Sequence, residues 1–224
     1  MSVFKDIVNL WNSDSLLSQA WDESHNMMTL SNEMFLQALS FIREGGKNKK
    51  IKSLKKRDAE INTYHREVRR KVVTHYAIVQ NMDDLPSGLV LLNMVVDIER
   101  VGDYTKNILD LALNYPDTIC SEKISQDLYN VEQEVTDRFN QTIEAIANQD
   151  QDLAKSLMKG YKKNLTKVCD TIVTDCISGK ITTGSESKTT ALALYARYLK
   201  RIGGHLYNIA TILVNPFEAV GYKK

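Results

Sequence analysis

Hydrophobic residues recur at helical spacing along most of the chain. In the stretch around Ile98, Val101 and Gly102, a turn of 100° per residue gathers the apolar positions on one side, as in an amphipathic helix. Glycines and prolines separate six such stretches of about 27–32 residues, each roughly 40–48 Å long as a helix. The six candidate helices span roughly residues 13–43, 49–80, 85–114, 122–148, 151–178 and 187–214. Long helices joined by short loops lie antiparallel, so we expect an all-α fold.

Proline positions divide the six helices into two groups of three. Proline is costly inside a helix, by about 3 kcal/mol. Pro86 therefore fits a helix start, whereas Pro116 and Pro216 fit helix ends. The break at Pro116 predicts two tandem antiparallel three-helix bundles, residues 1–117 and 118–224, packed together as one globular unit.

The two groups of three helices resemble each other in sequence. A shift of 101 residues lays Glu99-Arg100-Val101-Gly102-Asp103 over Lys200-Arg201-Ile202-Gly203-Gly204, and Asn107-Ile108 over Asn208-Ile209. Both matches lie in the third helix of their group, which indicates an internal duplication. Each copy places a glycine on the core face of a long helix, where it costs about 1 kcal/mol relative to alanine. Close approach of a neighbouring helix backbone is the interpretation we favour for both glycines.

Charge and composition exclude several classes of protein. The chain has 29 Lys+Arg and 28 Asp+Glu, a net charge of +1, which argues against general nucleic-acid binding. Its 10 Gly and 3 Pro are too few for an all-β fold. An odd count of 3 Cys argues against a disulfide framework. The N-terminus shows no secretory signal, and the longest apolar run, Leu89–Val96, is too short to span a membrane, so we expect a soluble cytoplasmic protein.

The third helix of the first group carries two acidic residues, Glu99 and Asp103, four positions apart and away from the core face. Paired carboxylates repel each other unless a cation or a donor lies between them. They suit Mg²⁺ or Mn²⁺ and also serve iron and zinc. Alternatively, they form a hydrated acidic face whose charge Arg100 and Lys106 dilute. On the second helix, Asp58 falls on an apolar stripe, where it either binds a ligand or stays hydrated at the bundle edge.

The same residues carry a family resemblance. Asp97-Ile98-Glu99-Arg100-Val101-Gly102-Asp103, followed by Asn107-Ile108, resembles the repeated signature of PhoU proteins, Leu-Glu-Arg-Ile-Gly-Asp-His followed by Asn-Ile-Ala. The second copy, Leu199 to His205 with Asn208-Ile209-Ala210, resembles it too. Asp58-Ala59-Glu60-Ile61-Asn62 is similar to the family's Asp-x-x-Ile-Asp/Asn element. The resemblance implies two three-helix bundles with a pseudo-two-fold relation.

In some members of that family the acidic pairs hold multinuclear iron or zinc clusters. Carried over by position, the resemblance implies an iron or zinc site, with Mg²⁺ or Mn²⁺ also compatible, at Glu99, Asp103 and Asp58. The second copy departs from the pattern, because Lys200 replaces the glutamate and Gly204 the aspartate. Gly160 falls where the counterpart of Asp58 is expected. A lysine opposes a divalent cation, so we expect metal in the first repeat only.

A basic segment lies at the first turn between helices. It includes Lys49, Lys50, Lys52, Lys55 and Lys56, and is either a hydrated helix start or a surface for an acidic partner or anionic lipid. It lacks interleaved aromatic residues, so base stacking is poorly supported.

By resemblance, the chain is a non-catalytic, cytoplasmic regulator of phosphate uptake and phosphate-starvation signalling. Its expected partners are a phosphate transporter subunit, a sensor histidine kinase or both, with peripheral membrane association and a homodimer as further expectations. The alternative is a metal-binding helical bundle with enzymatic or metal-storage activity. No Walker, nucleophile-elbow or dinucleotide-binding motif supports the enzyme, so we expect a regulator without catalysis.

Overall fold

The computed structural model describes residues 15–79, 83–115, 119, 125–148, 150–215 and 217–221. These residues are almost wholly helical, and none of them forms a strand, which confirms the all-α prediction. The elements are α2 (Leu16–Glu44), α3 (Asn48–Lys56), α4 (Asp58–Ile78), α5 (Leu85–Asn114), α6 (Ser125–Ala147), α7 (Gln151–Met158), the π-helix η1 (Tyr161–Thr166), α8 (Lys167–Ile177), α9 (Glu186–Val214) and the 3-10 helix η2 (Phe217–Ala219).

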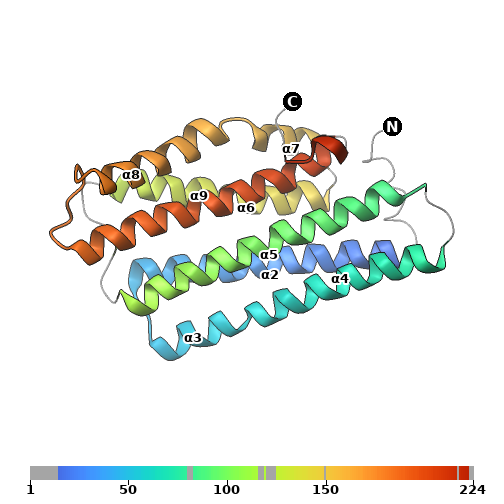
Figure 1. The fold of residues 1–224 in the computed structure, drawn as a ribbon, viewed down its shortest axis with the longest axis horizontal. Helices are drawn as coiled ribbons and strands as arrows, with labels where there is room; N and C mark the ends of the chain where they lie inside the picture. The colour runs from blue at the N-terminus through green and yellow to red at the C-terminus, as the bar shows by residue number, and fades with distance from the viewer. Residues whose placement is uncertain are drawn as a thin grey trace.

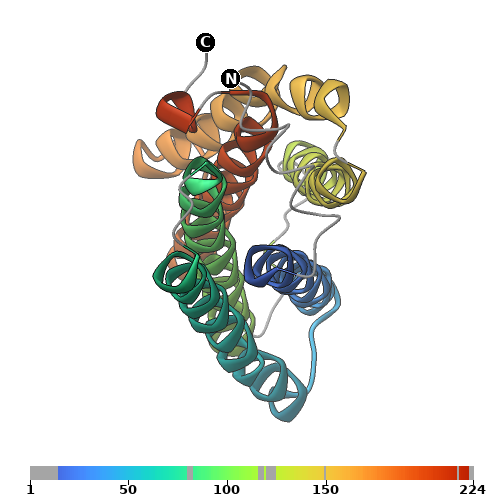
Figure 2. The same cartoon turned by 90° about the vertical axis from the view of Figure 1, so that its right-hand side faces the viewer.

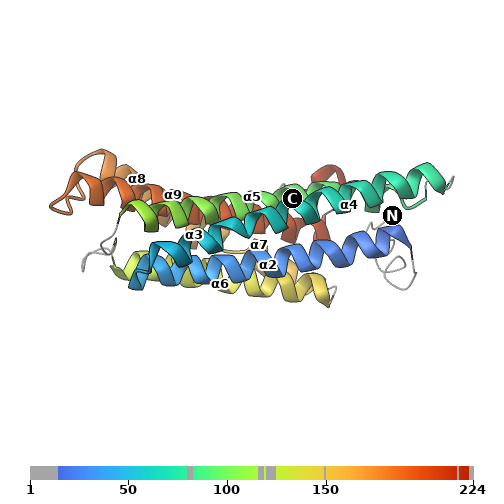
Figure 3. The same cartoon turned by 90° about the horizontal axis from the view of Figure 1, so that it is seen from below.

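The helices form two elongated bundles side by side (Figure 1). In the first, α2, α4 and α5 pack against one another; in the second, α9 packs against α6, α7 and α8. The long contact between α5 and α9, with a smaller one between α2 and α6, joins the bundles. Viewed along the helices, α5 and α9 lie next to each other where the two bundles meet (Figure 2). The assembly is a rod whose helices run along its long axis (Figure 3).

Local signals in the sequence explain several helix ends. Ser15 caps α2 by accepting a hydrogen bond from the Ser18 amide at 3.1 Å, and Gly45 ends that helix with a φ of 75°, a left-handed conformation that suits glycine. Pro86 lies in the first turn of α5, as predicted. The predicted helix ends at Pro116 and Pro216 lie outside the described residues, as do the expected boundary at residues 117 and 118 and Cys120.

The second helix of each bundle is interrupted, contrary to the prediction of continuous helices over 49–80 and 151–178. In the first bundle the break is mild: Arg57 keeps helical dihedral angles, and its amide donates to the Leu54 carbonyl at 3.0 Å, which tightens one turn. In the second, Gly160 is left-handed, with a φ of 74°, and the π-helix η1 follows it. Periodicity alone did not reveal either break, because the apolar spacing continues through both.

The hydrophobic core extends through both bundles. A buried carboxylate of the second bundle also forms an ion pair with the first bundle. Glu132 of α6 is 1% exposed and accepts a hydrogen bond from the Tyr195 hydroxyl of α9 at 2.6 Å. Its second oxygen pairs with Arg43 of α2. The ion pair between Arg43 and Glu132 compensates the cost of burying the carboxylate charge. It also joins the two repeats, because Arg43 lies in the first and Glu132 in the second. No helix among the described residues has the length and apolarity that a membrane span requires.

Candidate functional site

The structure brings together the three carboxylates that the sequence singled out. Asp58 begins α4 and is buried, while Glu99 and Asp103 stand on adjacent turns in the middle of α5. Burial raises the pKa of Glu99, and the nearby negative charges of Asp103 and Asp58 raise it further. The carboxylates therefore repel one another and need a counter-charge.

Lys106 supplies that counter-charge from the next turn of α5. Its ammonium nitrogen lies 2.8 Å from Asp58 Oδ2 and 3.1 Å from Asp103 Oδ1. Burial acts to lower the pKa of Lys106, but the hydrogen bonds to Asp58 and Asp103 outweigh it and raise that pKa, so the side chain stays charged. Asn62 also donates to Asp58 Oδ2, at 2.9 Å.

Arg100, which is exposed, pairs with one oxygen of Asp103 and one oxygen of Glu99. Its Nη1 lies 3.0 Å from Asp103 Oδ2, and its Nε lies 3.5 Å from Glu99 Oε2. Among the described residues, no group of three His, Cys, Asp or Glu side chains is arranged to hold a metal ion. In this arrangement the carboxylates do not fit iron or zinc, because the Lys106 ammonium lies between Asp58 and Asp103, where a bridging cation would sit. The two cations also match the alternative in which Arg100 and Lys106 dilute the acidic charge.

Both core glycines of the third helices face an aliphatic side chain of the second helix. A Cβ on Gly102 would lie 2.9 Å from Ile61 Cδ1, and one on Gly203 would lie 2.8 Å from Leu165 Cδ1. The nearest atoms to both glycines belong to side chains, so the prediction that a helix backbone approaches them closely is wrong.

These two contacts also correct the alignment of the repeats. Gly102 and Gly203 are equivalent, so their neighbours Ile61 and Leu165 are equivalent too. Asp58 lies three residues before Ile61, and Lys162 lies three residues before Leu165. Counted back from these two contacts, the position of Asp58 corresponds to Lys162, two residues after the expected Gly160. The break at Gly160 shifts the register of the second helix, which a fixed sequence offset does not reveal.

The second repeat thus has positive charge at the positions that carry the acidic cluster in the first repeat. Lys162, Lys200 and Gly204 stand where the first repeat has Asp58, Glu99 and Asp103. Lys200 Nζ forms two contacts with Asp170 of α8, at 2.6 and 2.7 Å. The absence of metal from this repeat stays a prediction.

The basic segment is mostly free for outside contacts. Lys49, Lys50, Lys52 and Lys56 are exposed, while Ile51 and Leu54 anchor α3 in the core. Only Lys55 of the five predicted lysines pairs with an acid in the described part of the chain, Asp110 of α5. The segment lies along the outer edge of the first bundle (Figure 1).

Sequence reasoning missed two partners at these sites. From the sequence, Lys106 has only the role of diluting the acidic charge. A cation three residues after Asp103 lies on the same side of a helix, and that spacing is a signal for the pair. Asp170 gave no local signal, because it reaches Lys200 from a different helix.

Comparisons with known proteins agree with this architecture. The PhoU domain model matches residues 25–112 and 128–213, one match in each repeat. The fold is similar to the crystal structure of PhoU from Pseudomonas aeruginosa, with a TM-score of 0.79 at 20% identity over 89% of this chain and 95% of that chain. It is also similar to the phosphate transport system regulatory protein PhoU from Streptococcus pneumoniae, with a TM-score of 0.74 at 16% identity over 88% and 93% of the two chains. No curated protein matches the sequence. Because the family model covers most of the chain, in both repeats, the chain belongs to the PhoU domain family.

Proposed function

We propose that this protein is a non-catalytic regulator of phosphate transport and of the response to phosphate starvation. The match of the PhoU domain model to both repeats carries the proposal. The similar Streptococcus pneumoniae structure is named as a phosphate transport system regulatory protein, which points the same way.

The arrangement of charged groups supports a role without catalysis. Asp58, Glu99 and Asp103 form ion pairs with Lys106 and Arg100. Glu132 is likewise held by Arg43 and Tyr195. Carboxylates locked in ion pairs fix the relative positions of helices, and a rigid two-bundle rod is a suitable surface for a partner to recognise.

The proposed partners are a cytoplasmic subunit of a phosphate transporter, a sensor histidine kinase or both, and the proposed location is the cytoplasmic side of the membrane. The exposed lysines of α3 would favour an acidic partner surface or anionic lipid headgroups. A homodimer remains a prediction, to be checked by sedimentation.

Deletion of the gene tests the proposal directly. In phosphate-replete medium, the deletion strain should express phosphate-starvation genes that the parent represses, and its phosphate uptake should change. Restoring the wild-type chain should restore repression. Normal repression and normal uptake in the deletion strain would refute the proposal.

A metal-binding bundle with enzymatic or storage activity is the second candidate. The convergence of Asp58, Glu99 and Asp103 favours it, and the Lys106 ammonium between two of them opposes it. Metal analysis of the purified protein, paired with a phosphatase and oxidase screen, separates the candidates. Turnover that disappears in Glu99→Ala would overturn the regulatory proposal.

A further inference from the structure

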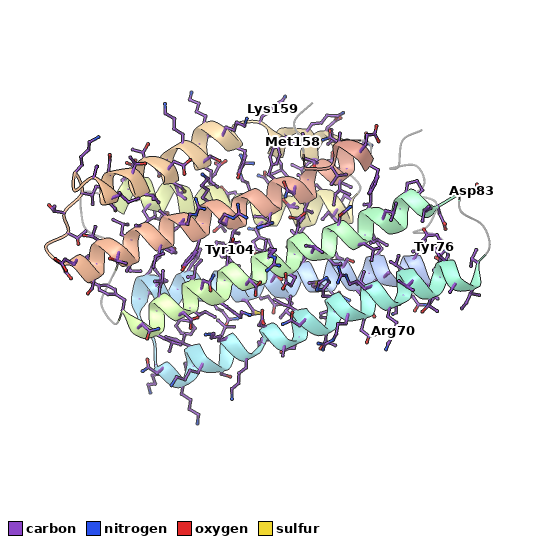
Figure 4. All side chains as sticks on the ribbon, in the orientation of Figure 1. Arg70, Tyr76, Asp83, Tyr104, Met158 and Lys159 are labelled. Atoms are coloured by element: carbon purple, nitrogen blue, oxygen red, sulfur yellow. The ribbon has the colours of Figure 1, made fainter. Side chains whose placement is uncertain are left out.

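The second repeat contains a large cavity where the first repeat has its acidic cluster. The cavity has a volume of about 810 Å³ and lies between the α7–η1 segment and α9. Lys162, Lys200 and Gly204, the counterparts of Asp58, Glu99 and Asp103, all line it. Met158 and Lys159 also line it, and both are labelled on the outer side of the second bundle (Figure 4).

Every charged side chain in the described lining of the cavity is basic. The lysines and arginine that line it are Lys155, Lys159, Lys162, Lys163, Lys200 and Arg201. Two of these charges are already neutralised, because Lys155 pairs with Asp152 at 2.9 Å and Lys200 with Asp170. The others form no ion pair with an acidic residue in the described part of the chain. Four positive charges therefore surround a hollow without a counter-ion from the protein.

Glycine makes room for a ligand in the wall of this cavity. A Cβ on Gly204 would lie 2.9 Å from the Tyr161 hydroxyl, so an aspartate at this position, as in the first repeat, would crowd the wall and add a negative charge. Tyr161 stacks on Tyr207, with ring centroids 4.9 Å apart, and both line the cavity. The wall thus combines cations with hydroxyl groups and flat aromatic faces.

We propose that this cavity binds a small anion carrying two or more phosphoryl groups. Lysine and arginine are the side chains best suited to phosphoryl oxygens, which accept several charge-assisted hydrogen bonds. The cavity volume falls in the range of small-molecule sites, about 300–1,000 Å³. The cavity is therefore larger than a single phosphate ion. Such a ligand supplies the negative charges that the second repeat has lost. The ligand site goes beyond the proposed regulatory function, and it is testable on the purified chain alone.

Calorimetric titration with tripolyphosphate, ATP and inorganic phosphate tests the site at about 0.15 M salt, where exposed charges are screened. We expect saturable binding of tripolyphosphate at one site per chain and at least tenfold weaker binding of inorganic phosphate. Tighter binding of ATP than of tripolyphosphate supports the proposal with a nucleotide as the ligand. Equal or weaker binding of ATP supports it with an inorganic oligophosphate.

Two variants and a control locate the binding site. The exposed pair Lys162→Ala/Lys163→Ala should weaken tripolyphosphate binding about tenfold or more, since two charge-assisted contacts are lost. Gly204→Asp should weaken it as well by placing a carboxylate in the wall, and circular dichroism confirms that each variant folds. The matched control Lys49→Ala/Lys50→Ala removes two exposed lysines from α3 and should bind within twofold of wild type. The proposal would be overturned if neither tripolyphosphate nor ATP bound, or if inorganic phosphate bound as tightly as tripolyphosphate. It would also be overturned if the control variant weakened binding as much as the site variants. None of these results would refute the proposed regulatory function.

Discussion

Tyr104 of α5 and His205 of α9 occupy the same position in the two repeats, and their rings stack on each other with centroids 5.8 Å apart. Tyr104 is labelled where α5 and α9 meet (Figure 4). The neighbouring contacts follow the same symmetry. His205 Nδ1 lies 2.7 Å from Asp97 Oδ1, and Tyr104 lies 6.1 Å, centroid to centroid, from Tyr198, the counterpart of Asp97. The pseudo-two-fold axis that relates the two repeats therefore passes between Tyr104 and His205.

Removal of the Asp97 carboxylate should loosen the interface between the repeats. Asp97 Oδ1 accepts from Asn208 Nδ2 at 3.1 Å as well as facing His205, so Asp97→Ala leaves two partly buried polar groups without a partner. We expect a loss of about 1–3 kcal/mol in the free energy of unfolding, measured by denaturant titration. The exposed Asp22→Ala is the control and should change it little. Equal losses in the two variants would contradict the role of Asp97.

Lys106→Met should destabilise the first bundle and expose the acidic cluster to cations. Two carboxylates would lose the ammonium group that donates to both, at a cost of about 1–3 kcal/mol. The melting temperature should then rise on addition of Mn²⁺ or Zn²⁺ to the variant, because a divalent cation replaces the lost charge.

Wild type and two further variants control the metal experiment. Lys71→Met removes an ammonium group that, among the described residues, pairs with Glu23 alone, so its melting temperature should not respond to metal. Asp103→Asn added to Lys106→Met should reduce the metal response. A wild-type response as large as that of Lys106→Met would show that Lys106 does not exclude metal, and would favour the predicted iron or zinc site.

Gly203→Ala should separate α9 from the second helix of its bundle. The new methyl group would overlap the end of Leu165, and such overpacking costs about 1–3 kcal/mol. Higher helix propensity offsets up to about 1 kcal/mol of this. Thermal unfolding should therefore show a net loss of stability, whereas Gln37→Ala on the exposed side of α2 should show none. A gain in stability for Gly203→Ala would contradict the tight contact.

Cys169 should react with thiol reagents far more slowly than Cys176. Burial raises the pKa of Cys169 to about 12, so almost none of it is thiolate near pH 8. Burial also raises the pKa of Cys176, but that side chain is partly exposed. In a Cys120→Ser background, DTNB kinetics of Cys169→Ser and Cys176→Ser assign each rate. Below its pKa, the Cys169 rate should rise about tenfold per pH unit. Similar rates for Cys169 and Cys176 at pH 8 would contradict this.

The basic segment should confer weak binding to anionic vesicles. Each lysine near such a surface contributes about 1 kcal/mol, so changing Lys49, Lys50, Lys52 and Lys56 to glutamate should abolish co-sedimentation with phosphatidylserine-rich vesicles. Lys55 is left in place because it pairs with Asp110. Vesicles of phosphatidylcholine alone are the control. Binding that survives the substitutions would dismiss the membrane role of this segment.

The sequence by itself determined the helical class of the fold, the grouping of the helices and the duplication, but not the breaks in the second helix of each bundle. Periodic apolar positions specify which side of a helix is buried, and Gly45 and Pro86 mark two helix ends, so local physics suffices there. It also singled out Glu99 and Asp103 by a repeated motif, and Asp58 by its place on an apolar stripe.

Only the tertiary structure decided what surrounds those residues. The partner of Lys200 comes from another helix, and the equivalence of Lys162 with Asp58 depends on a break at Gly160 that shifts the second helix. The basic cavity exists because η1 and α9 bring distant lysines to one place. Charges interact through space, so the partner of a charged side chain depends on which helices pack against each other. Spacing within one helix does not specify how helices pack.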